Sequence, residues 1–196
     1  MATTIISCTD TFARPKAQRG FSLLEVVISM AVLTVGLVSL LGVFCLAMAS
    51  TQDTQQDMIA KQLANEALES IVTARNTAQL QWTSIQNVSN GGIFLDNYQQ
   101  MYTAGGDGIL GTADDVTGAT YQSMKEPGPD GIYGTSDDVV VGLSNYQRQI
   151  QILPVTDVNG NIDATLRAIN VSIQYSTTRT RVPKTYVLNS FMSAFR

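Results

Sequence analysis

The hydrophobic pattern of the chain begins with one long uncharged segment. Between Val26 and Ala49 there is no Asp, Glu, Lys or Arg. An apolar stretch of this length can span a bilayer as a helix, which needs about 20 residues. One carboxylate, that of Glu25, lies at the start of the stretch. Because a charged group is costly in lipid, Glu25 needs either a partner or a function.

After Ala49 the polarity changes, but the pattern still predicts a helix. Residues 50–81 contain neither Pro nor Gly, and Asp57 and Lys61 have the spacing of a favourable i,i+4 ion pair. Apolar residues recur at steps of three and four: Ile59, Leu63, Ala67, Leu68, Ile71 and Val72. This spacing is typical of an amphipathic helix. We therefore expect one helix from about Ser22 to near Ala78, whose second half packs on a globular domain.

The last third of the chain alternates with the period of a β-strand. Residues 146–152, 169–175 and 186–192 each place similar side chains at every second position. The pair Asn159-Gly160 is a hairpin signal between the first two segments. We expect three or four antiparallel strands with one face covered by the helix. The fold class is therefore α+β, with a long N-terminal helix packed on a C-terminal antiparallel sheet and an Asp/Gly-rich loop insertion.

Composition and charge narrow the classes of function. The chain has 196 residues and a formal net charge of −4, which leaves room for one domain and an anchor. Mild acidity without a large basic patch argues against a nucleic-acid partner. The chain has no histidine, and its two cysteines, Cys8 and Cys45, are not placed for catalysis or for zinc. We therefore expect that the protein is not an enzyme.

The residues ahead of the apolar segment have an unusual order for a signal peptide. Arg14, Lys16 and Arg19 are followed by Gly20 and then directly by the long apolar run. A secretory signal has an apolar region of about 7–15 residues and a small-residue cleavage site after it. The apolar helix is therefore expected to stay with the mature protein. The basic residues before it orient the N-terminus to the cytoplasm.

The segment Arg19-Gly20-Phe21-Ser22-Leu23-Leu24-Glu25-Val26 resembles the processing site of type IV pilins and of type II secretion pseudopilins. In that family, prepilin peptidase cuts after the glycine and the new N-terminal residue is N-methylated. The resemblance implies cleavage between Gly20 and Phe21, N-methylation of Phe21 and a role for Glu25 in assembly. It covers roughly residues 14–50, and the rest of the chain matches only by general layout. The alternative interpretation is a plain single-pass anchor.

The resemblance also implies how the chain is organised and where it acts. Residues 1–20 would be a leader peptide, and residues 21–49 the membrane or filament-core half of the helix. Residues 50–196 would form an extracytoplasmic domain, with the outer half of the helix at 50–80, Asp/Gly loops at 103–142 and the sheet at 143–196. The implied partners are other pilin subunits, prepilin peptidase, an inner-membrane assembly platform and the membrane. The chain would cross the bacterial inner membrane once and then enter a periplasmic or extracellular filament.

One departure from the family pattern favours a minor pilin or a pseudopilin over a major pilin. Many major pilins carry a proline midway along the helix, whereas this chain has Gly36 and Gly42 in that zone. Glycine weakens a helix without removing a hydrogen bond, and it also permits close packing between helices. A type II secretion pseudopilin shares every N-terminal feature and is the alternative. From a different class, the chain could be a single-pass membrane-anchored calcium-binding sensor or binding module.

A repeated Asp/Gly motif suggests metal binding. Residues 107–115 and 130–138 share the pattern D-G-I-x-G-T-x-D-D, 23 residues apart. Glycines let the backbone turn, and aspartates supply the hard oxygen ligands that Ca²⁺ prefers. We expect calcium at one site per loop or at one shared site, with these ligands: Asp107, Asp114, Asp115, Asp130, Asp137 and Asp138. The alternative is that the motif forms Asp-Gly turns in which the aspartates cap the backbone.

Overall fold

The computed structural model describes residues 20–116, 120–176 and 182–195 and confirms the predicted α+β class. The expected basic leader, including Arg14, Lys16 and Arg19, lies outside the described residues apart from Gly20. The chain divides into two compact units, Met1–Ala47 and Met48–Arg196. Each unit is described by itself below.

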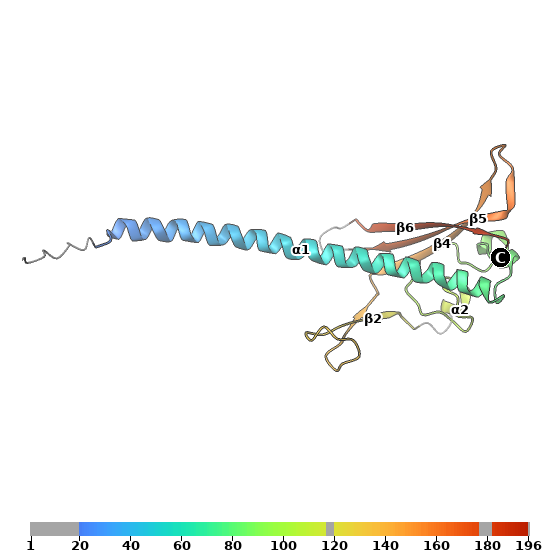
Figure 1. Cartoon of the computed structure of the whole chain (residues 1–196), viewed down its shortest axis with the longest axis horizontal. Helices are drawn as coiled ribbons and strands as arrows, with labels where there is room; N and C mark the ends of the chain where they lie inside the picture. Colours follow the sequence, from blue (N-terminus) through green and yellow to red (C-terminus); the bar gives the residue numbers. More distant parts are fainter. Residues whose placement is uncertain (1–19, 117–119, 177–181, 196) are drawn as a thin grey trace, which may run out of the picture. The chain divides into compact units, whose positions relative to one another are not determined.

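The long helix expected from the sequence is α1, Leu23–Asn76 (Figure 1). It begins after Ser22, whose carbonyl accepts the backbone N–H of Glu25 at 2.9 Å. The backbone remains helical at both Gly36 and Gly42, so neither residue unwinds the helix. Its last turn contains Arg75, where a cation is favoured by the helix dipole.

In the first unit, α1 exposes its apolar side chains on every side. All residues from 20 to 47 are exposed. Within the described part of the chain, α1 is the one helix with the length and apolar composition needed to cross a membrane. An all-round apolar helix needs lipid or other helices as its surroundings.

In the second unit, four antiparallel strands form the main sheet, in the order β1-β4-β5-β6. Their bounds are Gln99–Gln100 for β1, Tyr146–Thr156 for β4, Ile162–Tyr175 for β5 and Lys184–Ser193 for β6. The predicted hairpin at Asn159-Gly160 joins β4 to β5, and Gly160 has the positive φ, 85°, that the turn requires.

The amphipathic half of α1 and the inner face of this sheet form the core. Ile59, Leu63, Ala67 and Ile71 are buried as predicted, but Val72 is 37% exposed. Val72 lies about 100° around the helix from Ile71, which takes it away from the sheet. The sheet contributes the fully buried side chains of Ile150, Ile169, Val171 and Ile173.

The ion pair expected between Asp57 and Lys61 is replaced by contacts from α1 to the sheet. The Tyr175 hydroxyl donates to Asp57 at 2.6 Å, and the Lys184 ammonium group lies 3.4 Å from the same carboxylate oxygen. Burial, and then the nearby Asp57 carboxylate, raise the pKa of Tyr175. Asp57 therefore links the helix to β5 and β6.

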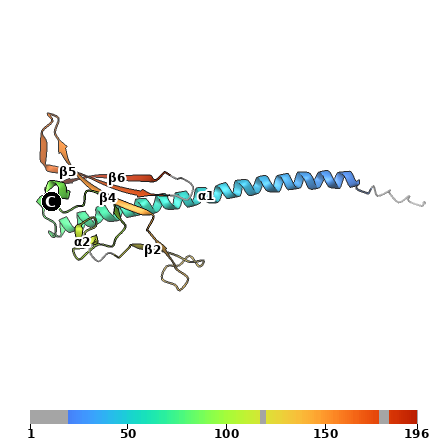
Figure 2. The ribbon, with the colours of Figure 1, turned by 180° about the vertical axis from the view of Figure 1, so that it is seen from behind.

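The remaining elements lie between α1 and β4 in the sequence. They are the short helices η1, Trp82–Ser84, η2, Val88–Asn90, and α2, Ala113–Val116, and the antiparallel pair β2, Ser123–Glu126, with β3, Val139–Gly142. In both views the β2–β3 hairpin lies on the other side of α1 from β6 (Figures 1 and 2). The Gln55 amide donates to Glu126 at 2.6 Å and ties the end of β2 that leads into the loop to the helix.

Candidate functional site

The described part of the predicted processing segment, residues 20–26, lies immediately before α1 and in its first turn. Gly20, Phe21 and Ser22 are exposed and precede the helix, and Glu25 is exposed in the first turn. Phe21 and Glu25 are four residues apart, a separation close to the 3.6 residues of about one helical turn. An acidic side chain in the first turn is also favoured by the helix dipole.

Nothing in the described fold requires a glycine at position 20. A Cβ built on Gly20 meets no atom of the described chain within 4 Å, and its φ lies outside the left-handed region. The same space is open at Gly36 and Gly42 in the middle of the first unit. These three glycines are therefore not explained by packing within the described chain.

The first Asp/Gly loop, residues 105–115, brings its three predicted ligands together. One oxygen each from Asp107, Asp114 and Asp115 lie within 4.8 Å of one another. Burial raises the pKa of Asp115. The pKa of Asp114 is lowered, chiefly because the Thr112 hydroxyl donates to it at 2.5 Å.

Donors from the loop itself occupy these carboxylates. Asp115 accepts the backbone N–H groups of Gly105 at 2.9 Å and Gly111 at 2.6 Å. Asp114 accepts that of Asp107 at 3.2 Å, and Asp107 accepts that of Ile109 at 2.8 Å. The aspartates therefore organise the turn, as the alternative interpretation of the motif expects. Calcium binding by the same oxygens stays a prediction.

The second loop, residues 128–138, repeats this hydrogen-bonding pattern. The N–H of Ile132 donates to Asp130 at 2.8 Å, and that of Gly134 donates to Asp138 at 2.8 Å. The Thr135 hydroxyl donates to Asp137 at 2.5 Å. The carboxylates of this loop do not join the cluster formed by the first loop in the described residues.

A glycine at the start of each loop is a shared feature that sequence reasoning missed. A Cβ at Gly105 would lie 2.2 Å from the Asp114 carboxylate, and one at Gly128 would lie 2.2 Å from the Asp137 carboxylate. Both carboxylates therefore approach the backbone so closely that only glycine fits at positions 105 and 128. The signal was available, because the two glycines stand at the same offset from the two copies of the motif.

The two loops differ completely in burial. Ile109 and Leu110 of the first loop are each 3% exposed, whereas their counterparts Ile132 and Tyr133 are 61% and 68% exposed. The first loop packs closely enough that a Cβ on Gly111 would lie 2.6 Å from Cδ1 of Ile150. The equivalent Gly134 has open space around it.

Arg148 on β4 is a buried charge beside the first loop. Desolvation lowers its pKa, opposed by the carboxylates of Asp115 and Glu66. Its Nη1 atom has no hydrogen-bond partner among the described residues. The alternating pattern of the strand correctly places Arg148 on the inner face, but it does not reveal the acidic groups that balance its charge.

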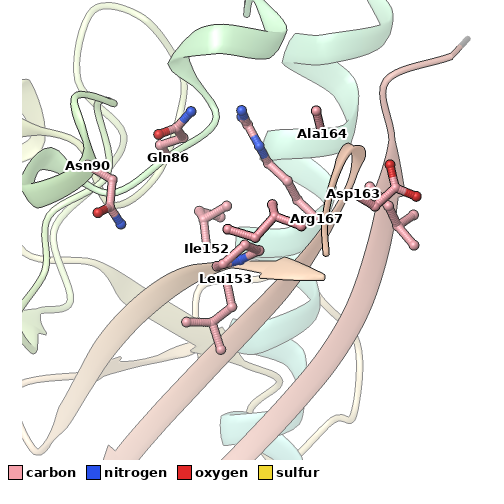
Figure 3. Close-up of a pocket in the computed structure, with 10 residues that line it drawn as sticks. Gln86, Asn90, Ile152, Leu153, Asp163, Ala164 and Arg167 are labelled. Atoms are coloured by element: carbon pink, nitrogen blue, oxygen red, sulfur yellow. The ribbon is translucent and has the colours of Figure 1, made fainter. Parts of the chain in front are cut away.

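A groove of about 470 Å³ lies beside the β4–β5 hairpin (Figure 3). Its lining includes Gln86, Ile152, Asp163 and Arg167. The Arg167 guanidinium donates to the carbonyls of Trp82 and Ile85 and lies 4.3 Å from the centre of the Trp82 ring. Arg167 is therefore occupied in holding η1 to β5, and the groove presents no nucleophile–base pair from the described residues.

Comparison with protein families identifies the N-terminal segment. Residues 15–41 match the model of the prokaryotic N-terminal methylation motif, the signature of type IV pilin and pseudopilin precursors. The match contains Gly20, Phe21 and Glu25 and confirms the resemblance seen in the sequence. Neither the curated proteins nor the solved structures gave a match. The motif supports a pilin-like or pseudopilin precursor, a class of structural proteins.

Alanine substitutions at the two equivalent glycines will separate backbone strain from packing. Gly111 and Gly134 have φ values of 90° and 89°, so alanine carries a similar backbone cost at both, about 1–2 kcal/mol. At Gly111 the contact with Ile150 adds an overpacking cost of about 1–3 kcal/mol. We expect Gly111→Ala to lower the free energy of unfolding more than Gly134→Ala, measured by urea titration of the detergent-solubilised chain with Trp82 fluorescence. Equal losses would contradict the packing of the first loop.

Calcium binding can be tested by thermal unfolding of the same preparation. If the loops bind Ca²⁺ with the affinity of extracellular modules, about 1 mM Ca²⁺ will raise the Tm and EDTA will reverse the rise. Asp114→Asn should reduce the shift more than the matched Asp137→Asn, because only the first loop gathers three carboxylates within 4.8 Å in the described residues. An unchanged Tm in calcium would leave the loops as aspartate-capped turns.

Proposed function

We propose that this chain is a structural subunit of a type IV pilus-like filament, a minor pilin, which is cleaved by prepilin peptidase and assembled through its N-terminal helix. The observation that carries the proposal is the methylation motif at residues 15–41, which lies at the start of a helix of 54 residues. Two features of the structure support it, namely the exposed apolar surface of the first unit and the position of Glu25.

The apolar surface of residues 20–47 needs to be covered. A contiguous exposed apolar surface marks a region that contacts a membrane or other proteins. Before assembly, lipid would surround the helix, with the N-terminus in the cytoplasm. After assembly, helices of neighbouring subunits would replace the lipid, and the domain after residue 50 would lie outside the membrane.

Cleavage between Gly20 and Phe21 would create a positive charge that can pair with the Glu25 carboxylate. The new α-amine of Phe21 is positive and stands four residues from Glu25 in the sequence. In a bundle of apolar helices, a carboxylate is stable only if it is paired. An amine from a neighbouring subunit would pair with Glu25 in a medium of low dielectric constant and would set the axial register of the two subunits.

The glycine at position 20 is also consistent with processing. Because the described fold leaves open space around Gly20, the requirement for a small residue would come from the peptidase rather than from the chain. The scissile bond would lie in an exposed segment ahead of the helix, where an enzyme can reach the backbone.

The choice of a minor pilin rests on the middle of α1. The helix has Gly36 and Gly42 where many major pilins have a proline, and it stays helical at both. A type II secretion pseudopilin would share the motif and the helix. Co-purification of the chain with pilus filaments would favour the pilin, whereas loss of protein secretion in a deletion strain would favour the pseudopilin.

Processing is predicted to depend on Gly20 and not on glycine content in general. The mature wild-type chain should have the mass of residues 21–196 plus one methyl group. Gly20→Val should retain the leader, whereas Gly36→Val, at a position with equally open surroundings, should be processed normally. Intact-mass spectrometry of the membrane-extracted protein checks both. A wild-type chain that keeps residues 1–20 would instead support a membrane-anchored sensor or binding module.

Glu25 is predicted to act in assembly and not in processing. Glu25→Ala would leave the α-amine unpaired in the bundle, and loss of one partner of a buried pair is expected to lower incorporation by about tenfold or more. The control is Glu69→Ala, which removes an exposed carboxylate from the second half of the same helix. Incorporation is measured by immunoblotting of sheared filaments, with processing followed by mass. Normal incorporation of Glu25→Ala would rule out the pairing.

A further inference from the structure

The buried first Asp/Gly loop shows what kind of surface the exposed tip of the second loop can contact. The two loops share their sequence pattern and their aspartate hydrogen bonds, yet only the first buries its apolar pair, Ile109 and Leu110. The second loop presents the equivalent pair, Ile132 and Tyr133, to solvent. A motif that packs against protein in one copy therefore has an unoccupied apolar surface in the other.

The first loop shows which kind of surface the motif fits. It lies against α1 and β4, where the backbone N–H of Leu110 is 3.4 Å from the Ser70 hydroxyl and Gly111 sits against Ile150. The Gln79 side chain donates to the Asp107 carbonyl beyond the end of the helix. The motif thus packs on a surface made of one helix and one strand.

The second loop is held away from its own core by an ordered support. Its two ends continue into β2 and β3, which pair through four residues each. The bond from Gln55 to Glu126, at the end of β2 that leads into the loop, anchors this hairpin to α1. The exposure of Ile132 and Tyr133 is therefore built into the fold.

We propose that the tip of the second loop, Ile132 and Tyr133, docks on a second copy of this chain, in the groove between α1 and β6. This inference rests on the proposed function, because it describes a contact between assembled subunits. It adds a contact in the second unit to those of the apolar helix.

The groove has the chemistry that the tip requires. Its volume is about 440 Å³, and it is lined by one helix and the edge of one sheet: Thr54, Asp57, Met58, Lys61, Tyr175, Thr185 and Tyr186. The exposed Met58 supplies an adaptable apolar contact for an aromatic ring. The groove therefore offers the same combination of helix and strand that receives the first loop.

Charge complementarity selects this groove for the second loop. The loop carries three carboxylates, those of Asp130, Asp137 and Asp138. On the groove side, the Asp57 carboxylate is engaged by Tyr175 and Lys184. Lys61 is exposed on the same helix and lines the groove, where its charge would face the docked acidic loop. Opposite charges of this kind guide partners and set their register.

The two surfaces lie on different sides of one subunit. The hairpin that carries the second loop is on the other side of α1 from β6 in both views (Figures 1 and 2). Contacts between two different surfaces are heterologous, so they can repeat from subunit to subunit without closing into a dimer. This is the type of contact that an open filament uses.

Cysteine cross-linking of the full-length protein in cells tests the contact. In a Cys45→Ala background, Tyr133→Cys is combined with Met58→Cys. We expect mild oxidation to give a ladder of dimers and higher multimers, and each single variant to stay monomeric. The matched control combines Met58→Cys with Val158→Cys, a fully exposed position at the tip of the β4–β5 hairpin, and should give no ladder.

Each other outcome overturns the inference in a recognisable way. Dimers from Tyr133→Cys alone would indicate a tip-to-tip contact, and a cross-link to a different protein would assign the tip to another partner. If the chain is processed and incorporated but gives no cross-link, this inference fails while the proposed function stands. If the chain is neither cut at Gly20 nor incorporated, both fail.

A second variant separates docking from stability. Ile132→Ser with Tyr133→Ser should leave the Tm unchanged, because both side chains are exposed. When Met58→Cys is combined with Ser136→Cys, the same double substitution should reduce cross-linking by about tenfold, as expected for loss of a buried aromatic anchor. A lower Tm would show that the pair stabilises its own subunit. Undiminished cross-linking would show that the pair does not contribute to the contact between subunits.

Discussion

Packing of the α1 stripe against β4 and β5 is the contact on which the second unit depends. Ile71 of the helix and Ile150 and Ile173 of the strands are almost completely buried there, and burial of apolar area is the main favourable contribution to folding. The polar links lie around this core: Asp57 joins the helix to β5 and β6, and Arg75 donates to the Ala194 carbonyl at 2.6 Å. These links direct the helix onto the sheet but do not replace the core.

Elements whose signal is local were predictable from the sequence. The periods of 3.6 and 2 residues located α1 and the three long strands, and Asn159-Gly160 located the hairpin, because each pattern arises from backbone geometry. The errors concern partners that are distant in the sequence. Asp57 was assigned to Lys61, one turn away on its own helix, but the sheet supplies Tyr175 and Lys184 from more than 100 residues further on.

The candidate sites show the same division between local sequence signals and contacts that are distant in the sequence. The segment around Gly20 and Glu25 is recognised from adjacent residues because a peptidase reads a short peptide, and the family match covers that segment. The aspartate-capped turns also follow from local sequence. The different burial of Leu110 and Tyr133 does not, because it depends on what the rest of the fold places beside each loop. The balance of charge around Arg148 was equally inaccessible, since its acidic neighbours come from α1 and α2.

The repeated loop has a consequence for how this protein can change over evolution. Substitutions at Ile109 or Leu110 disturb a packed interior, so selection for stability limits them. Substitutions at Ile132 or Tyr133 leave that interior intact, because the second copy stands clear of it. The fold thus constrains the first version of the motif from within, whereas the second is constrained only by its contact with another subunit. Related lineages could change the second tip together with the groove that receives it while inheriting an unchanged scaffold.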